Sequence, residues 1–148
     1  MRYYAVFDTN VLISSLLTKK PGTATGEVID LIADGVITPV FNDDILAEYE
    51  EVLRRTKFSF SEQASQNMLR MFRALWENID PLAGNAAFFA DEDDRVFFEV
   101  TMAKRSETTK DEDAYLITGN LRHFPVEPFI VTPAEMLSII RKTAQQDC

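Results

Sequence analysis

The sequence has very little cysteine or histidine: its 148 residues include one of each, Cys148 and His123. One cysteine excludes a disulfide framework and every multi-cysteine zinc or iron–sulfur site, and one histidine argues against a histidine-rich metal site. The sequence also lacks an apolar run of the roughly 20 residues that a membrane-spanning helix needs. Residues 1–6 have neither the length nor the flanks of a signal peptide. We therefore expect a cytoplasmic protein that makes no use of a membrane.

Positive charge is also scarce, with 15 Lys and Arg against 24 Asp and Glu, a formal charge of −9. This balance excludes a protein that coats nucleic acid through a broad basic face. A hydrophobic content of 46% excludes an intrinsically disordered chain. No repeat and no linker-like stretch divides the sequence, so residues 1–148 are predicted to form a single domain.

Short apolar runs of strand length alternate with helical patterns along the whole sequence. The predicted strands lie at residues 2–7, 36–41, 115–118 and 129–131. Their apolar residues are continuous rather than alternating with polar ones, which is typical of a parallel sheet covered by helices on both faces. The predicted fold class is therefore α/β, with a mainly parallel sheet.

The regions between these strands carry further expectations. A long amphipathic helix is predicted over residues 61–78, with most of its apolar residues in the core. Residues 104–112 are rich in charge and are predicted to form a solvated loop. Thr132 and Glu135 have the spacing of a capping box, with Pro133 at the first helical position, and predict a helix start.

Polar residues follow three of the predicted strands, at residues 8–10, 42–44 and 118–120. In open α/β sheets, binding sites form at the carboxyl ends of the strands, near the point where the strand order reverses. Asp and Asn are also common turn and capping residues, so each cluster taken alone has a purely structural explanation.

Two further acidic residues stand on predicted helices. Glu48 shares a helix face with Ile45 and Val52, at the edge of the core, where a carboxylate must be paired or bind a cation. A salt bridge is as good an explanation for Glu48 as a functional role. Asp94 belongs to an acidic run but lies on the same side as Phe97, so we expect it to face inward.

Carboxylates gathered at one edge of a sheet repel one another unless a cation neutralises them. A hard divalent ion such as Mg²⁺ takes carboxylate, water and phosphate oxygens as ligands. Such an ion can activate water for a displacement at phosphorus. The acidic residues are therefore interpretable as a phosphodiester-cleaving site.

Four segments, in this order, resemble the four motifs of PIN-domain nucleases. They are residues 6–13, 44–53, 91–100 and 114–120. Each motif alone is weak, but the ordered set is specific and covers nearly the whole chain. The similarity extends to the bacterial branch described as toxin components of toxin–antitoxin systems, related to VapC-type toxins.

This resemblance implies a three-layer α/β/α fold and a Mg²⁺- or Mn²⁺-dependent endoribonuclease. By motif position, the catalytic, metal-binding acids would be Asp8, Glu48 and Asp94. The polar residues that support them and position water or phosphate would be Asn10, Thr118 and Asn120, with Asn120 counted among the catalytic residues.

Asn120 departs from the common pattern, because many family members have Thr-Gly-Asp where this sequence has Thr-Gly-Asn. An amide brings no negative charge, which leaves the number of bound metal ions open. It also leaves an alternative function open, a catalytically degenerate PIN-fold module that binds another protein. Phosphoryl transfer through an aspartyl intermediate is disfavoured, since Asn10 stands where such phosphatases need a second Asp.

The resemblance also suggests partners. RNA is the expected substrate, and an antitoxin protein or a second copy of the chain are possible partners. The candidate contacts are Met68, Met71, Phe72 and Trp76, for which core packing is the simpler explanation. Candidate phosphate contacts are Lys19, Lys20, Arg122 and His123, each of which taken singly is better explained as ordinary surface charge, and we expect His123 to be structural.

Overall fold

The computed structural model of the chain describes residues 1–18, 21–55, 60–79, 89 and 91–146. Its sheet has five strands, namely β1 (Arg2–Phe7), β2 (Ile37–Phe41), β3 (Glu77–Asn78), β4 (Glu112–Ile117) and β5 (Ile130–Val131). The strand order is β3-β2-β1-β4-β5, and every neighbouring pair is parallel. The predicted parallel sheet is confirmed.

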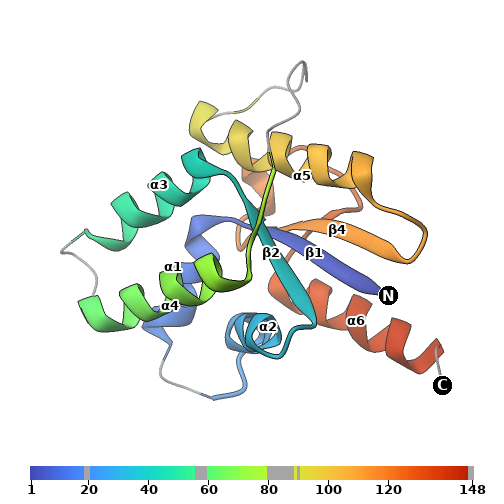
Figure 1. Cartoon of the computed structure of the whole chain (residues 1–148), viewed down its shortest axis with the longest axis horizontal. Helices are drawn as coiled ribbons and strands as arrows, with labels where there is room; N and C mark the ends of the chain where they lie inside the picture. The colour runs from blue at the N-terminus through green and yellow to red at the C-terminus, as the bar shows by residue number, and fades with distance from the viewer. Residues whose placement is uncertain (19–20, 56–59, 80–88, 90, 147–148) are drawn as a thin grey trace.

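Within the described residues, six α-helices and two short 3-10 helices surround the sheet. They are α1 (Thr9–Leu17), α2 (Ala24–Ala33), α3 (Asp43–Leu53), α4 (Glu62–Leu75), η1 (Glu92–Asp94), α5 (Arg95–Glu107), η2 (Leu121–His123) and α6 (Pro133–Gln146). Helix α5 crosses one face of β1 and β4, and α2 and α6 pack against each other on the opposite side (Figure 1). This is the three-layer α/β/α arrangement.

The helix boundaries follow local sequence rules. Asn42 caps α3 by accepting a hydrogen bond from the Ile45 amide at 2.9 Å. Thr132 and Glu135 form the predicted capping box, with reciprocal bonds of 3.0 and 3.2 Å. Gly35 adopts a φ of +79° just beyond α2, a conformation that a residue with a Cβ rarely takes.

Aromatic side chains fill the layer between the sheet and helices α3 and α4. The Phe72 ring lies 5.6 Å from that of Phe7, and the Trp76 ring stacks on Phe41 at 4.4 Å. Phe72 is completely buried and Met68 is nearly so. The core-packing explanation for the apolar side of α4 therefore holds for these residues.

Two sequence expectations need correction. The predicted helix over residues 61–78 ends at Leu75, because Trp76 turns extended and Glu77–Asn78 pairs with β2 as strand β3. The predicted loop over residues 104–112 is helical up to Glu107, where α5 ends. In both places a partner distant in the sequence determines the backbone conformation.

Candidate functional site

The carboxyl ends of β1 and β4 lie side by side at the centre of the sheet. Phe7 pairs with Ile117, and the Asp8 amide donates a hydrogen bond to the Ile117 carbonyl at 2.9 Å. The chain passes from β1 to β2 on one side and later returns to β4 on the other, so this is where the strand order reverses. Asp8 and Thr118 thus stand together at the place where α/β proteins bind ligands.

Asp8 is a buried carboxylate, with 6% of its surface exposed. Its Oδ2 accepts hydrogen bonds from the Thr118 hydroxyl at 2.8 Å and from the Asn10 amide nitrogen at 3.1 Å. Burial raises the pKa of Asp8, and the hydrogen bond from Thr118 opposes that rise. Both donors are neutral, so they orient the carboxylate without cancelling its charge.

The two donors are themselves held in place by the backbone that follows β4. The Thr118 hydroxyl accepts from the Asn120 amide at 3.0 Å, and Asn10 Oδ1 accepts from the Gly119 amide at 3.2 Å. Asn10 and Thr118 therefore each contact both Asp8 and the turn after β4. This is the supporting role predicted for Asn10 beside Asp8, and it fixes the carboxylate with respect to two strands.

Asp94 is the second carboxylate of the site and lies at the end of η1, just before α5. Its side chain is 15% exposed, as expected for an inward-facing residue. Burial, and next the negative charge of Asp8, raise the pKa of Asp94 to about 6. Two carboxylates that are distant in the sequence therefore repel each other across this site.

Asn120 and His123 complete the cluster from the turn after β4. Nδ2 of Asn120 lies 3.0 Å from Nε2 of His123, and Nδ1 of His123 lies 3.6 Å from Oδ2 of Asp94. His123 is half exposed, whereas Thr118 behind it is fully buried. The site thus opens to solvent on the side of His123.

Glu48 lies on α3, next to Tyr49, whose hydroxyl donates to the Phe7 carbonyl at 2.5 Å and ties the helix to the end of β1. Glu48 is half-buried, and its pKa is raised by burial and then by the charges of Glu51 and Asp93. Among the described residues, no three His, Cys, Asp or Glu side chains are arranged so that they could hold a metal ion together. The structure thus brings Asp94 to Asp8, and brings Glu48 among the acids around Asp93.

The remaining sequence candidates divide into two groups. Arg122 is exposed beside the site, and Lys19 and Lys20 lie outside the described residues. His123, expected to be structural, contacts two of the candidate site residues, Asn120 and Asp94. The sequence feature that could have indicated the contact with Asn120 is the spacing of three residues between Asn120 and His123, because side chains three apart lie above one another in a 3-10 turn.

The donor chemistry of the cluster fits a hard divalent cation. Asp8, Asp94 and Asn120 all offer oxygen atoms, and Mg²⁺ is commonly held by one or two carboxylates together with waters and substrate oxygens. In the portion of the chain that is described, neither Asp8 nor Asp94 is paired with a lysine or arginine. A cation would offset the burial that raises the pKa of Asp8, and both the burial and the charge of Asp8 that raise the pKa of Asp94.

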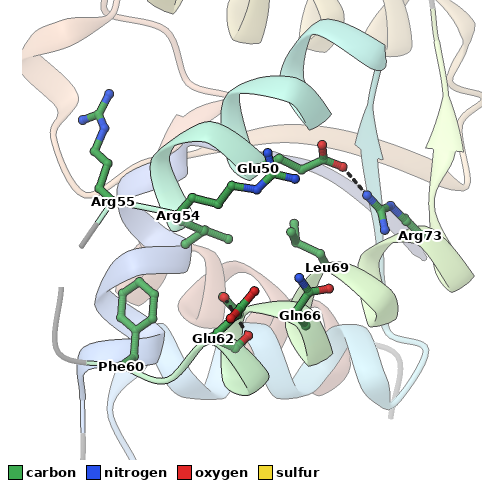
Figure 2. Close-up of a pocket in the computed structure, with 10 residues that line it drawn as sticks. Glu50, Arg54, Arg55, Phe60, Glu62, Gln66, Leu69 and Arg73 are labelled. Carbon is green, nitrogen blue, oxygen red and sulfur yellow. Dashed lines mark hydrogen bonds and ion pairs between the residues drawn. The ribbon is translucent and has the colours of Figure 1, made fainter. Parts of the chain in front are cut away.

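A second hollow, of about 340 Å³, lies between α3 and α4 and has a different character. Figure 2 shows arginines reaching into it from both helices, and Arg73 is paired there with Glu50. The lining residues are Glu50, Leu53, Arg54, Arg55, Phe60, Glu62, Ser65, Gln66, Leu69 and Arg73. None of them belongs to the carboxylate cluster.

Comparison with known proteins gives one match. A family model described as PIN domain matches residues 4–122, a span that begins in β1 and ends in η2. The match therefore contains every residue of the cluster except His123, which is the next residue along the chain. Neither a curated protein nor a solved structure matches the chain.

Proposed function

This chain belongs to the PIN domain family, and we propose that it is a metal-dependent endoribonuclease. PIN domains are typically nucleases, and PIN nucleases generally use divalent metal ions. The proposal adds three points to family membership: that this chain depends on a metal, that its substrate is RNA, and that particular residues catalyse the reaction.

One observation carries the proposal. Asp8 and Asp94 lie near each other at the carboxyl ends of the central strands. Burial of Asp94, and next the charge of Asp8, raise the pKa of Asp94 to about 6. Their hydrogen-bond partners, Thr118 and Asn10 for Asp8, are neutral. A protein that keeps such a pair destabilises its own fold unless the pair binds something positive.

Asp8 and Asp94 would hold the divalent ion, with Glu48 as a third acid at the rim. The ion, when bound, would lower the pKa of a water and stabilise charge on the phosphate. The chain's own residues supply the orientation: Thr118 and Asn10 hold Oδ2 of Asp8 and leave its Oδ1 without a hydrogen bond from either. Hydrolysis would break the bond between phosphorus and O3′, leaving a 5′-phosphate and a 3′-hydroxyl.

The test is cleavage of a panel of single-stranded and structured RNAs with Mn²⁺ or Mg²⁺, comparing the wild-type protein with Asp8→Asn. Asp8→Asn keeps the size of the side chain and removes its charge, so we expect cleavage to fall by roughly 100-fold or more. Asp30→Asn, the same change at an exposed residue of α2, is the matched control and should cleave like the wild type.

Thermal unfolding of each variant shows whether it is folded, and mass spectrometry of the products identifies the 5′-phosphate. Absence of metal-dependent cleavage in the wild type, or equal cleavage by Asp8→Asn, would refute the assignment and leave the alternative of a protein-binding PIN-fold module. Cleavage of DNA but not RNA under the same conditions would refute the choice of substrate.

We further propose that the chain is the toxin of a toxin–antitoxin pair, with an antitoxin protein or a second copy of itself as partner. The support is the resemblance of its four motifs to that branch of the family. Induced expression in bacteria should arrest growth for the wild type and not for Asp8→Asn. Unimpaired growth at equal protein levels would contradict the toxin role while leaving the nuclease proposal standing.

A further inference from the structure

His123 is the single histidine of the chain and ends the 3-10 turn η2, for which Asn120 is the N-cap. Its two ring nitrogens contact two different residues of the site. Nε2 lies 3.0 Å from Nδ2 of Asn120, and Nδ1 lies 3.6 Å from Oδ2 of Asp94. The ring therefore stands between the amide and the carboxylate.

The chemistry of these neighbours selects one state of the ring. The Nδ2 atom of an asparagine can only donate hydrogen bonds, so the Nε2 atom that it contacts must be the nitrogen with the free lone pair. The other nitrogen, Nδ1, faces the Asp94 carboxylate at 3.6 Å, which is longer than a hydrogen bond, and the negative charge of that carboxylate favours a hydrogen on Nδ1. Both contacts are satisfied by the same neutral tautomer, with its proton on Nδ1.

We propose that His123 is a positioning residue, whose Nδ1-protonated imidazole holds Nδ2 of Asn120 and so leaves Oδ1 as the ligand-accepting end of that amide. The inference rests on the proposed function, because the ligand in question is the cation or its bound water. The backbone of Asn120 is fixed as well, since its amide donates to the Thr118 hydroxyl at 3.0 Å.

Fixing this amide matters because its two ends have opposite effects on a cation. The oxygen end attracts a cation or accepts from its water, whereas the NH₂ end repels it. Rotating the amide by half a turn exchanges the two ends with almost no change in shape. A residue that holds the nitrogen end therefore decides whether Asn120 helps or hinders binding, and groups that orient metal ligands in this way are typically worth about 10- to 100-fold in metal affinity or activity.

The first experiment needs neither metal nor substrate. Long-range ¹H–¹⁵N correlation spectra of the ¹⁵N-labelled protein, at about pH 8.5 where an ordinary imidazole is neutral, report on His123 alone because the chain has one histidine. We expect the proton mainly on Nδ1 in the wild type, with a clear increase of the Nε2-protonated form in Asn120→Ala. Arg122→Ala removes an exposed charge next to His123 and should leave the spectrum unchanged.

A wild-type ring protonated mainly on Nε2, or a tautomer unaffected by Asn120→Ala, would overturn the inference. Both results are independent of whether the protein cleaves RNA. They therefore distinguish failure of the inference from failure of the proposed function.

The second experiment measures the Mn²⁺ concentration that gives half of the metal-induced rise in melting temperature, and half-maximal cleavage where cleavage occurs. For His123→Ala we expect both midpoints to rise by about 10- to 100-fold, with a smaller effect on cleavage at saturating Mn²⁺. His123→Gln offers a carbonyl oxygen to Nδ2 of Asn120 and should recover part of the loss. Lys142→Ala removes an exposed charge on helix α6 and serves as the control.

Equal midpoints for His123→Ala and the wild type would overturn the inference. So would an equal shift in Lys142→Ala, because the effect would then not be specific to His123. A loss in His123→Ala that His123→Gln does not reduce at all would contradict the role of the Asn120 contact.

Discussion

Buried charged side chains have oppositely charged partners at one end of the sheet and neutral partners at the other. Near the amino ends of the strands, the ammonium group of Lys104 is buried, lies 2.6 Å from Oε1 of Glu77 and sits 3.8 Å from the centre of the Tyr4 ring. Beside it, Arg105 is paired with Asp113 at 3.0 Å. At the carboxyl ends, Asp8 has neutral hydrogen-bond partners.

The presence or absence of an oppositely charged partner distinguishes charged side chains that stabilise the fold from those that are available to bind a ligand. Lys104 is compensated by an acid and an aromatic face, so its burial is consistent with a purely structural role. Burial, and next the charge of Asp8, raise the pKa of Asp94, and among the described residues neither carboxylate is paired with a lysine or arginine. The uncompensated end of the sheet is therefore where a cation and a phosphate would bind.

Glu48 and Glu50 extend the comparison to a single helix. Both lie on α3, but Glu50 is paired with Arg73, whereas the charges that raise the pKa of Glu48 are those of Glu51 and Asp93. We expect Glu48→Gln to reduce metal-dependent cleavage by about 10- to 1000-fold and Glu50→Gln to leave it unchanged, in steady-state assays at saturating metal. If the two changes had equal effects on cleavage, the lack of a positively charged partner would not distinguish a functional glutamate from a structural one on α3.

Thr118→Val tests the neutral support of Asp8. The change keeps the shape of a fully buried side chain but removes the donor to Asp8 and the acceptor for the Asn120 amide. We expect cleavage to fall by about 10- to 100-fold, with a loss of about 1–3 kcal/mol in the free energy of unfolding. Chemical denaturation and initial rates measure both, and unaltered cleavage would remove Thr118 from the site.

Lys104→Met tests the compensated end of the sheet. Removing the ammonium leaves Glu77 without its partner, but that carboxylate is 38% exposed and can be hydrated. We expect the free energy of unfolding to fall by about 1–3 kcal/mol, with cleavage at saturating metal unchanged. The double variant Lys104→Met, Glu77→Gln should recover part of the loss. A change in cleavage with no change in stability would contradict a structural role.

The pH dependence of stability should differ between the metal-free wild type and Asp94→Asn. The pKa of Asp94 is raised from 3.8 to about 6 in the folded chain, so the folded state is relatively more stable when this carboxyl is protonated. That stability is fully present below about pH 4 and is lost as the pH rises through about 6.

We therefore expect the melting temperature of the wild type to fall by a few degrees relative to Asp94→Asn between these pH values. Saturating Mn²⁺ at neutral pH should restore the wild type, and EDTA should reverse that gain. Parallel pH profiles of the two metal-free proteins in calorimetry, or no effect of Mn²⁺ on the wild type, would contradict the uncompensated site.

Much of the fold follows from local pattern. The strand over residues 2–7, the corner at Asp8 and the capping box at Thr132 were all predictable, because each depends on residues adjacent in the chain. Helix α5 was predicted with too early an end, since Lys104 looks like a solvated charge until Glu77 and Tyr4 are placed against it.

The site shows the same division. Asp8, Asn10 and Thr118 could be selected from the sequence because each follows a strand that belongs in a parallel sheet, and the structure joins them by direct hydrogen bonds. The contacts of His123 with Asn120 and Asp94 could not be predicted, because they depend on a 3-10 turn and on the position of Asp94. Strand β3 was missed since two polar residues become a strand through pairing with β2.

The sequence by itself determined the order of strands and helices, the family, and the acids that stand at strand ends and helix starts. The strands, the helices and the positions of the acids follow from hydrophobic periodicity and capping, which act over a few residues, whereas the family follows from the resemblance of the four motifs. The tertiary structure alone decided which charges are compensated: it placed Glu77 on Lys104, and Asp94 with His123 beside Asp8. Such pairings depend on strand register and helix packing between distant segments, and no local pattern encodes them.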